Sequence, residues 1–275
     1  MKWFTAWRRR PWAGYAVVLA ALAIIGVAYA GASSSADRAQ ASDAPASAQD
    51  VAKGKELFNQ TCSSCHGVNA EGTRTAPSLI GVGAASVDFQ VGTGRMPATN
   101  PGAQIPRKKP IFNKEQIQQI AAYVASLGGP LGGGPPVPSP DQVDPAHGDS
   151  ALGGKLFRAN CAQCHNFAGS GGALTGGKYA PSLDKATPTQ IYEAMITGPQ
   201  AMPVFNDTTI TPAQKRAIIA YVTQTRDEPN PGGSGLGRVG PVAEGLVGWL
   251  VGIGFMVVAA MWLTARKPKK KQQND

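Results

Sequence analysis

The stretch CSSCH at Cys62–His66 recurs as CAQCH at Cys161–His165. Together the two stretches hold all four cysteines and two of the three histidines of the 275-residue chain. Residues i and i+3 of a helical turn lie on one face, so both thiols of each stretch can project in the same direction. This concentration of scarce, ligand-forming side chains predicts that the chemistry of the chain resides in these two motifs.

Cys-x-x-Cys followed by His is the pattern through which c-type haem is attached covalently. The paired thiols can reach the two haem vinyl groups, and the next imidazole can reach the iron. A structural zinc site needs four ligands, whereas each motif offers three and only His147 remains for both. Redox dithiols and local disulfides also use Cys-x-x-Cys, but the His after each pair argues against a redox dithiol. The sequence therefore predicts two covalently bound haem c groups, attached through Cys62, Cys65, Cys161 and Cys164, with His66 and His165 as iron ligands.

The second axial ligand of each iron is expected to be a methionine. Met96 is the one methionine of the first half that lies outside the N-terminus, and Met202 follows the second motif. Both precede a proline, which would stiffen the loop that presents the sulfur. Met195 is the alternative in the second half, but its helical spacing from other apolar residues favours core packing. His/Met ligation leaves no open position for oxygen, peroxide or substrate and raises the reduction potential, so the expected role is one-electron transfer.

The two motifs belong to an internal repeat. Gly54 and Phe58 recur as Gly153 and Phe157 at the same interval as the first cysteines. The other matches are Pro77 with Pro181, Met96-Pro97 with Met202-Pro203, and Tyr123 with Tyr221. Ordered matches of this kind indicate one small fold that has been duplicated.

Each repeat is expected to open and close with a helix. Asp50 and Asp149 are suitable caps for the opening helices. Thr211 with Gln214, and more loosely Asn113 with Gln116, form capping boxes for the closing ones. Gly54 and Gly153 would each cost a helix up to about 1 kcal/mol relative to Ala. That cost predicts a close crossing by another helix, with Tyr123 or Tyr221 over the gap; a frayed first turn is the alternative.

Two hydrophobic runs place the chain at a membrane. Gly245–Ala265 has no charged residue, and as a helix it would cover roughly 30 Å, the thickness of a bilayer core. Trp249 and Trp262 lie near its ends, where a bilayer interface favours them. Trp12–Ala30 is the other run, and Ala28-Tyr29-Ala30 is typical of a signal-peptidase site. The N-terminal run is therefore either a retained anchor or a cleaved signal.

The net charge of +9 does not indicate nucleic-acid binding, because it is concentrated at the two ends. Nine of the 26 Lys and Arg residues lie beside the hydrophobic runs, in residues 1–10 and 266–275, and the middle of the chain is nearly neutral. The positive-inside rule then keeps both ends in the cytoplasm and places everything between them on the extracytoplasmic side of the cell membrane, with one or two transmembrane helices.

Segments rich in Gly, Pro, Ala or Ser separate these parts. The linker after the first repeat is rich in proline, so it is expected to be an extended, semi-rigid spacer that packs as no element. The predicted order is an N-terminal hydrophobic helix (1–31), a flexible tether (32–49), the first domain (50–128), a Pro/Gly linker (129–147), the second domain (148–226), a second linker (227–241), a transmembrane helix (242–265) and a basic cytoplasmic tail (266–275).

The repeats resemble class I cytochrome c domains over essentially their whole length. The matched features are the opening Gly/Phe helix, the Cys-x-x-Cys-His motif, the Pro-Ser-Leu loop, the distal Met-Pro pair and the closing Tyr helix. This resemblance implies an all-α fold of two tandem domains, each wrapped on one haem. It also implies that the carbonyl groups of Pro77 and Pro181 accept the N–H of the iron-bound histidines.

The arrangement of the whole chain resembles the dihaem cytochrome c subunit, cytochrome cc, of the cytochrome bc complex of high-GC Gram-positive bacteria. That family implies a respiratory subunit that accepts electrons from the Rieske iron–sulfur protein and passes them to an aa-type cytochrome c oxidase, with cytochrome b as a further partner. The complex would be a quinol:cytochrome c reductase with menaquinol as the expected donor, while the isolated chain would be an electron carrier without a catalytic residue.

Other functions remain alternatives. A dihaem subunit of a cbb-type oxidase would have the same motifs, but such subunits typically carry an N-terminal anchor and no C-terminal one. A free dihaem shuttle would lack the anchor. A dihaem peroxidase would need a haem with an exchangeable or His-ligated distal side, and the Met-Pro pairs argue against it.

Overall fold

The computed structural model describes residues 18–24, 46–100, 102, 104–129, 133–228 and 241–265. The chain divides into two units, Met1–Pro45 and Ala46–Asp275. In the first unit, the described residues 18–24 are helical. The rest of the predicted N-terminal helix, nearly all of the tether, residues 229–240 of the second linker and the basic tail lie outside the described residues.

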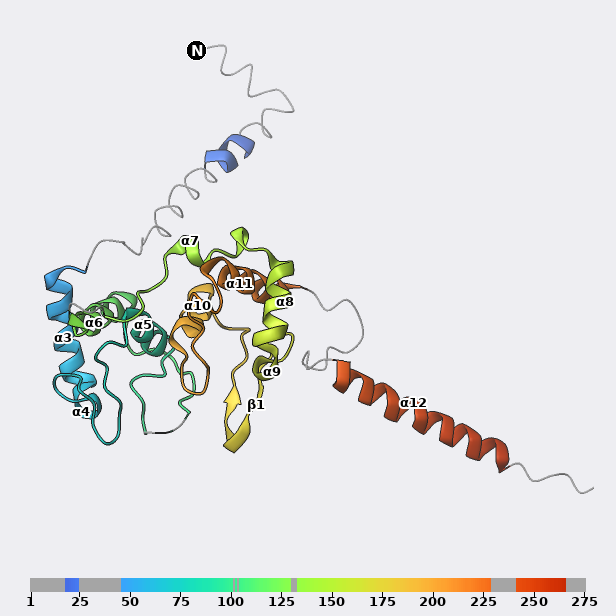
Figure 1. Ribbon diagram of the computed structural model, residues 1–275. Coiled ribbons are helices and arrows are strands. Elements are labelled where there is room, and N and C mark those ends of the chain that lie inside the picture. Colours follow the sequence, from blue (N-terminus) through green and yellow to red (C-terminus); the bar gives the residue numbers. More distant parts are fainter. Residues whose placement is uncertain are drawn as a thin grey trace, which may run out of the picture. The chain divides into compact units, whose positions relative to one another are not determined.

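The first domain is built from four helices around one apolar core. They are α3 (Ala48–Thr61), α4 (Ser63–His66), α5 (Ala84–Gly92) and α6 (Lys114–Ser126). Phe58, Ile120 and Val124 are almost fully buried at the centre of this core. Apolar residues at helical spacing on α3 and α6 face each other, and the two helices pack where they cross, as Figure 1 shows.

The second domain repeats this plan with its own core. Helix α8 (Ser150–Asn160) leads into α9 (Ala162–His165), followed by α10 (Pro188–Thr197) and α11 (Pro212–Asp227). Helix α8 packs on α11 as α3 does on α6 (Figure 1). The predicted plan of two similar, mostly helical domains is therefore confirmed.

One small hairpin departs from the all-helical plan. Strands β1 (Gly172–Ala173) and β2 (Tyr179–Ala180) pair antiparallel in the second domain, and the single 3₁₀ turn η3 (Thr175–Gly177) joins them. The loop between the motif histidine and the following proline is longer here, with 16 residues from His165 to Pro181 against 11 from His66 to Pro77. The extra residues include Gly176 and Gly177, whose positive φ angles make the tight reversal possible.

The opening and closing helices of each domain cross where a glycine removes the side chain. A Cβ atom added at Gly54 would collide with the main-chain carbonyl of Gln119, and one at Gly153 would collide with that of Ala217. Tyr123 and Tyr221 lie over the two crossings, with ring centroids 5.3 Å from Phe58 and 5.4 Å from Phe157. The close crossing inferred from these glycines is confirmed, and the helix propensity that they lose is offset by packing.

The helix caps confirm three of the four sequence expectations. Asp149 caps α8 by accepting from the main-chain N–H groups of Ala151 and Leu152. Asn113 and Thr211 each form a complete capping box at the start of α6 and α11. The expectation for Asp50 is wrong: Ser47 caps α3, and Asp50 lies inside the first turn. A carboxylate is favourable there too, because it faces the positive end of the helix dipole.

The expectation that the linker packs as no element is wrong for its second half. Residues 140–147 form α7 (Pro140–Val143) and the 3₁₀ turn η2 (Pro145–His147). Ser139 and Gln142 make a capping box with Pro140 at the first helical position, so proline starts this turn instead of preventing it. Val143 is buried in the core of the second domain. The predicted boundary at residue 148 therefore cuts through residues that pack with this domain.

The C-terminal run forms helix α12 (Pro241–Thr264). Its residues Gly245–Thr264 are long and apolar enough to cross a membrane, and none of that segment is buried inside the protein. An apolar helix with no protein cover requires an apolar surrounding, and a bilayer supplies one. Helix α12 is thus a candidate membrane anchor.

We predict that alanine at the two crossings destabilises the domains. Gly54→Ala and Gly153→Ala should each lower the free energy of unfolding by roughly 1–3 kcal/mol, because the added methyl group forces the helices apart. Gly92→Ala is the matched control, since a Cβ at Gly92 in α5 meets nothing within 4 Å. Denaturant unfolding of the purified protein measures all three. Equal stabilities for Gly54→Ala and Gly92→Ala would contradict the close crossing.

Candidate haem-binding sites

Both thiol motifs have the same backbone geometry. In the first, the N–H groups of Cys65 and His66 donate to the carbonyl of Cys62 at 3.1 and 2.9 Å. In the second, Cys164 and His165 donate to Cys161 at the same two distances. Each motif is therefore one tight helical turn that follows a long helix, and its paired thiols and imidazole belong to a single rigid unit.

Each motif histidine is held by a proline carbonyl. Nδ1 of His66 lies 2.8 Å from the carbonyl oxygen of Pro77, and Nδ1 of His165 lies 3.0 Å from that of Pro181. A carbonyl oxygen can only accept, so Nδ1 must carry the proton in both contacts. Nε2 is then left with a free lone pair and a fixed direction, which is the state that a metal ligand needs.

A glycine in each repeat brings the proline loop to the histidine. Gly72 and Gly171 have φ angles of +88° and +84°. A Cβ at Gly72 would lie 2.5 Å from the main-chain nitrogen of Ser78, and one at Gly171 would lie 2.8 Å from that of Ser182. The N–H groups of these glycines also donate to the carbonyls of the motif histidines, at 2.7 and 2.9 Å. This pair was not predicted from the sequence, although each glycine lies six residues after its motif histidine.

The first cysteine of each motif is the more buried of its pair. None of the four is in a disulfide. Burial, and secondly the charge of the partner cysteine, raise the pKa of Cys62 and of Cys161 to about 11. The reactive cysteine of a thioredoxin-like site has a lowered thiol pKa, so the raised pKa values of Cys62 and Cys161 are not those of such a nucleophile.

The three methionines considered as ligands lie in different surroundings. Met96 and Met202 are partly buried, each packed against the core of its own domain. Met195, on α10, is 2% exposed and belongs to the core itself. Burial in the core agrees with a packing role for Met195, and a loop position beside a proline leaves Met202 freer to coordinate.

The second motif opens into a cavity of about 340 Å³. Cys161, Cys164 and His165 line it together with Met202 and Met195, and apolar side chains supply much of the remaining lining. Paired thiols, an imidazole and a thioether around one apolar space are the donor set that haem c requires. The first domain has the same donors, with Met96 and Cys62 on one core cluster. The residues present therefore fit one haem in each domain.

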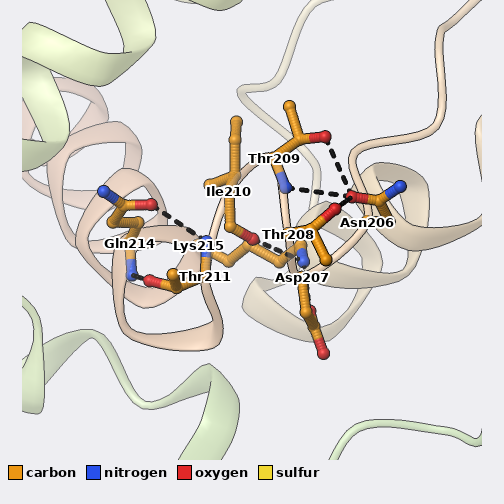
Figure 2. Close-up of polar contacts among 8 residues, drawn as sticks. All are labelled: Asn206, Asp207, Thr208, Thr209, Ile210, Thr211, Gln214 and Lys215. Carbon is orange, nitrogen blue, oxygen red and sulfur yellow. Dashed lines mark hydrogen bonds and ion pairs between the residues drawn. The ribbon is translucent and has the colours of Figure 1, made fainter.

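The loop that carries Met202 is fixed at its far end by a buried cation. Lys215 of α11 is fully buried, and its Nζ donates to the carboxylate of Asp207 at 2.5 Å and to the carbonyl of Ile210 at 2.8 Å. The side-chain oxygen of Asn206 accepts from the N–H of Thr209 at 2.9 Å (Figure 2). These contacts tie the loop to the start of α11, so the backbone after Met202 has little freedom.

The two domains touch through α5 and α10 and through the segment Gln104–Arg107. Gln104 makes two hydrogen bonds with the backbone of Tyr179, at 2.6 and 2.9 Å. Gln200 donates to the carbonyl of Ile105 at 2.9 Å. Sequence analysis assigned no role to this segment, because nothing in a local pattern shows which distant backbone a glutamine will meet.

A buried carboxyl group lies at the contact of α5 and α10. Glu193 is fully buried, and neither of its oxygens has a hydrogen bond of ordinary geometry. Burial first, and then the charge and longer contact of Asp88, raise the pKa of Glu193 from its ordinary 4.5 to about 10. Glu193 is therefore protonated at neutral pH, which avoids the cost of a buried negative charge.

Comparison with known proteins gives the same two domains. Residues 51–128 match the family described as Cytochrome c, and residues 148–222 match the one described as Cytochrome C oxidase, cbb3-type, subunit III. The cytochrome bc1 complex cytochrome c subunit of Corynebacterium efficiens is 47% identical over 232 residues, which cover 78% of this chain and 77% of that protein. The corresponding subunit of Mycobacterium leprae is 49% identical over 215 residues, 78% of this chain and 74% of that protein.

A more distant relative belongs to an oxidase. The Cbb3-type cytochrome c oxidase subunit FixP of Azorhizobium caulinodans is 28% identical over 185 residues, which cover 62% of this chain and 58% of that protein. The lower identity and the shorter overlap set this similarity apart from the two described above.

We predict that Glu193→Gln weakens the pH dependence of stability. Because the folded state holds this proton to a higher pH than the unfolded chain does, the contribution of Glu193 to stability is greatest below pH 4.5 and falls as the pH rises toward 10, by roughly 1.4 kcal/mol per unit at most. Unfolding at about pH 6 and about pH 9 should show a smaller loss for the variant. Glu56→Gln, on an exposed site of α3, is the control. Parallel pH profiles for wild type and Glu193→Gln would refute the assignment.

Proposed function

This chain belongs to the family of cytochrome c subunits of the cytochrome bc1 complex, and from that premise we propose that it relays single electrons from a Rieske iron–sulfur protein to an aa-type cytochrome c oxidase. It is a haem electron-transfer subunit with two covalently bound haem c groups. The observation that carries the proposal is identity near one half across both domains, in a chain that also has a C-terminal apolar helix.

We assign each haem a complete set of ligands. Cys62 and Cys65 attach the first haem and Cys161 and Cys164 the second, while His66 with Met96 and His165 with Met202 are the axial ligands. When bound, haem c supplies a one-electron Fe(III)/Fe(II) couple. The fixed imidazole directions, set by the carbonyls of Pro77 and Pro181, support this assignment.

The residues around each site favour electron transfer over catalysis. Two protein ligands on one iron leave no position for peroxide, and this argues against a peroxidase. The apolar lining excludes water and disfavours the extra positive charge of the oxidised state, so it raises the reduction potential together with the thioether ligand. With the histidines and loops held rigidly, little of the structure has to rearrange when the charge changes.

The membrane arrangement follows from the charges. Helix α12 is followed by five basic residues within Arg266–Lys271, which favour the cytoplasm. We therefore place both haem domains on the extracytoplasmic side, next to cytochrome b and the Rieske protein in the membrane. The whole complex would oxidise quinol, with menaquinol as the proposed donor, and this chain would carry electrons onward from it.

The alternative is a subunit of a cbb-type oxidase. The match of residues 148–222 and the 28% identity to an oxidase subunit favour it, but this identity is lower, and its overlap shorter, than for the bc1 subunits. In this alternative the chain would still transfer electrons, with an oxidase core as its main partner and no Rieske protein.

We predict that the complex co-purifies with this chain. A C-terminally tagged full-length chain, extracted in mild detergent, should bring down cytochrome b, the Rieske protein and an aa-type oxidase, and the preparation should consume oxygen with quinol and without soluble cytochrome c. Met202→Leu is the matched control: assembly should persist while oxygen consumption falls. Recovery with a cbb-type oxidase core, or with no Rieske protein, would decide for the alternative.

We predict that each ligand methionine sets the potential of one haem. Met96→Leu and Met202→Leu should each lower one of the two midpoint potentials in a redox titration and leave both haems covalently bound, because the thioether ligand is lost. Met195→Leu keeps the core volume and should leave both potentials near their wild-type values. If Met195→Leu moves a potential and Met202→Leu does not, Met195 is the ligand.

A further inference from the structure

The cavity at the second thiol motif is lined by both domains. Besides the residues of the second domain, its lining includes Phe89, Thr93 and Arg95 and the segment Gln104–Arg107, all from the first domain. If the second haem site were formed by the second domain alone, only residues of that domain would line the cavity. Instead, the first domain supplies part of one wall.

The first domain brings positive charge to this wall. Arg95 and Arg107 both line the cavity, and each is close enough for its charge to act on the other. Lys178 of the second domain adds a third basic side chain. Among the described residues that line the cavity there is no Asp or Glu, so the positive charges are not balanced within it.

Arg95 is the most informative of these residues, because it is buried without an anionic partner. Only 9% of its surface is exposed. Its guanidinium group lies 4.9 Å from the centre of the Phe89 ring, and in the described part of the chain it forms no ion pair and no side-chain hydrogen bond. Burying a charge costs free energy unless a partner compensates it, so this cation indicates a negatively charged ligand in the cavity.

We propose that Arg95 and Arg107 of the first domain bind the propionate groups of the haem that the second domain carries. This inference rests on the proposed second haem site. The propionates are the only anionic substituents of the haem, and there are two of them. Guanidinium groups suit carboxylates because their planar N–H donors can bond both oxygens at once.

The segment that carries Arg107 is held firmly against the second domain. Gln104 bonds both the N–H and the carbonyl of Tyr179, and Arg107 donates from one guanidinium nitrogen to the carbonyl of Lys185 at 3.0 Å. Arg107 has further N–H donors for a ligand, because a guanidinium has five. The hydrogen bonds therefore position the cation before any haem is attached.

The position of Arg95 links the two haem sites. It directly precedes Met96, the proposed ligand of the first iron. Neighbouring residues of one loop would thus serve different haems, one through its sulfur and the other through its guanidinium group. The binding site of the second haem is then complete only when the first domain packs against the second. The arrangement of the two domains therefore also determines how the two haems are arranged.

The test measures the potentials of full-length variants. Two positive charges near the second haem disfavour its oxidised state, so Arg107→Gln should lower the midpoint potential of the second haem and leave that of the first near its wild-type value. The variants are also made in a Met96→Leu background. This substitution lowers the midpoint potential of the first haem, so the titration waves of the two haems are separated. Arg107→Lys keeps the charge, so the midpoint potential of the second haem should stay close to its wild-type value. A merely structural role of Arg107 would not predict this difference between the Lys and Gln variants.

Two further variants complete the experiment. Arg95→Gln should shift the second wave in the same direction as Arg107→Gln, and haem content by pyridine haemochrome should remain two per chain. Arg158→Gln removes an equal charge from an exposed site on α8 of the second domain and is the control. A second wave that stays in place in both Arg107→Gln and Arg95→Gln, or that moves as far in Arg158→Gln, overturns the proposal. If Met202→Leu moves no wave, the proposed haem ligands fail instead.

Discussion

In each domain, the opening and closing helices pack together because a main-chain carbonyl of one helix lies against a glycine, a position without a side chain, of the other. At Gly54 and at Gly153 the carbonyl of the closing helix occupies the space that a Cβ would fill. This close approach brings the aromatic rings of the two helices into contact, Phe58 with Tyr123 and Phe157 with Tyr221, and the thiol motif begins at the end of the opening helix. The direction of the cysteines and of the histidine therefore depends on a crossing that lies a full helix turn or more away from them.

The two domains share this helix crossing but differ in the loops around it. The second domain has the longer loop after its histidine, where the hairpin β1–β2 forms, and that hairpin receives Gln104 of the first domain. Part of the proline-rich linker also folds onto the second domain through Val143. Duplication has thus produced one domain whose site is flanked by its neighbour. Both domains belong to one chain, and the contacts between them give a physical reason for keeping them together.

Three ionisable side chains, Lys215, Glu193 and Arg95, are buried in the two domains. Lys215 has a carboxylate and a carbonyl as partners within its own domain, and it fixes the loop of Met202. Glu193 has no such partner and is neutral at physiological pH because its pKa is raised. Arg95 is a cation that cannot lose its proton in this range, so it has to be compensated by a ligand. Three buried ionisable groups are thereby accommodated in three different ways.

The sequence by itself determined the elements whose signals are local. Cys-x-x-Cys-His fixes thiols and imidazole within one turn, the capping boxes at Asn113 and Thr211 fix where helices begin, and an uncharged run of bilayer length fixes the anchor. The cap at Ser47 and the turns at residues 140–147 were missed because local patterns there compete, and packing decides between them. Only the tertiary structure decided that Arg95, Gln104 and Arg107 reach the second site, since their partners lie some 70 or more residues further along the chain. Such contacts depend on how two folded surfaces meet, and no periodicity or spacing in the sequence encodes that meeting.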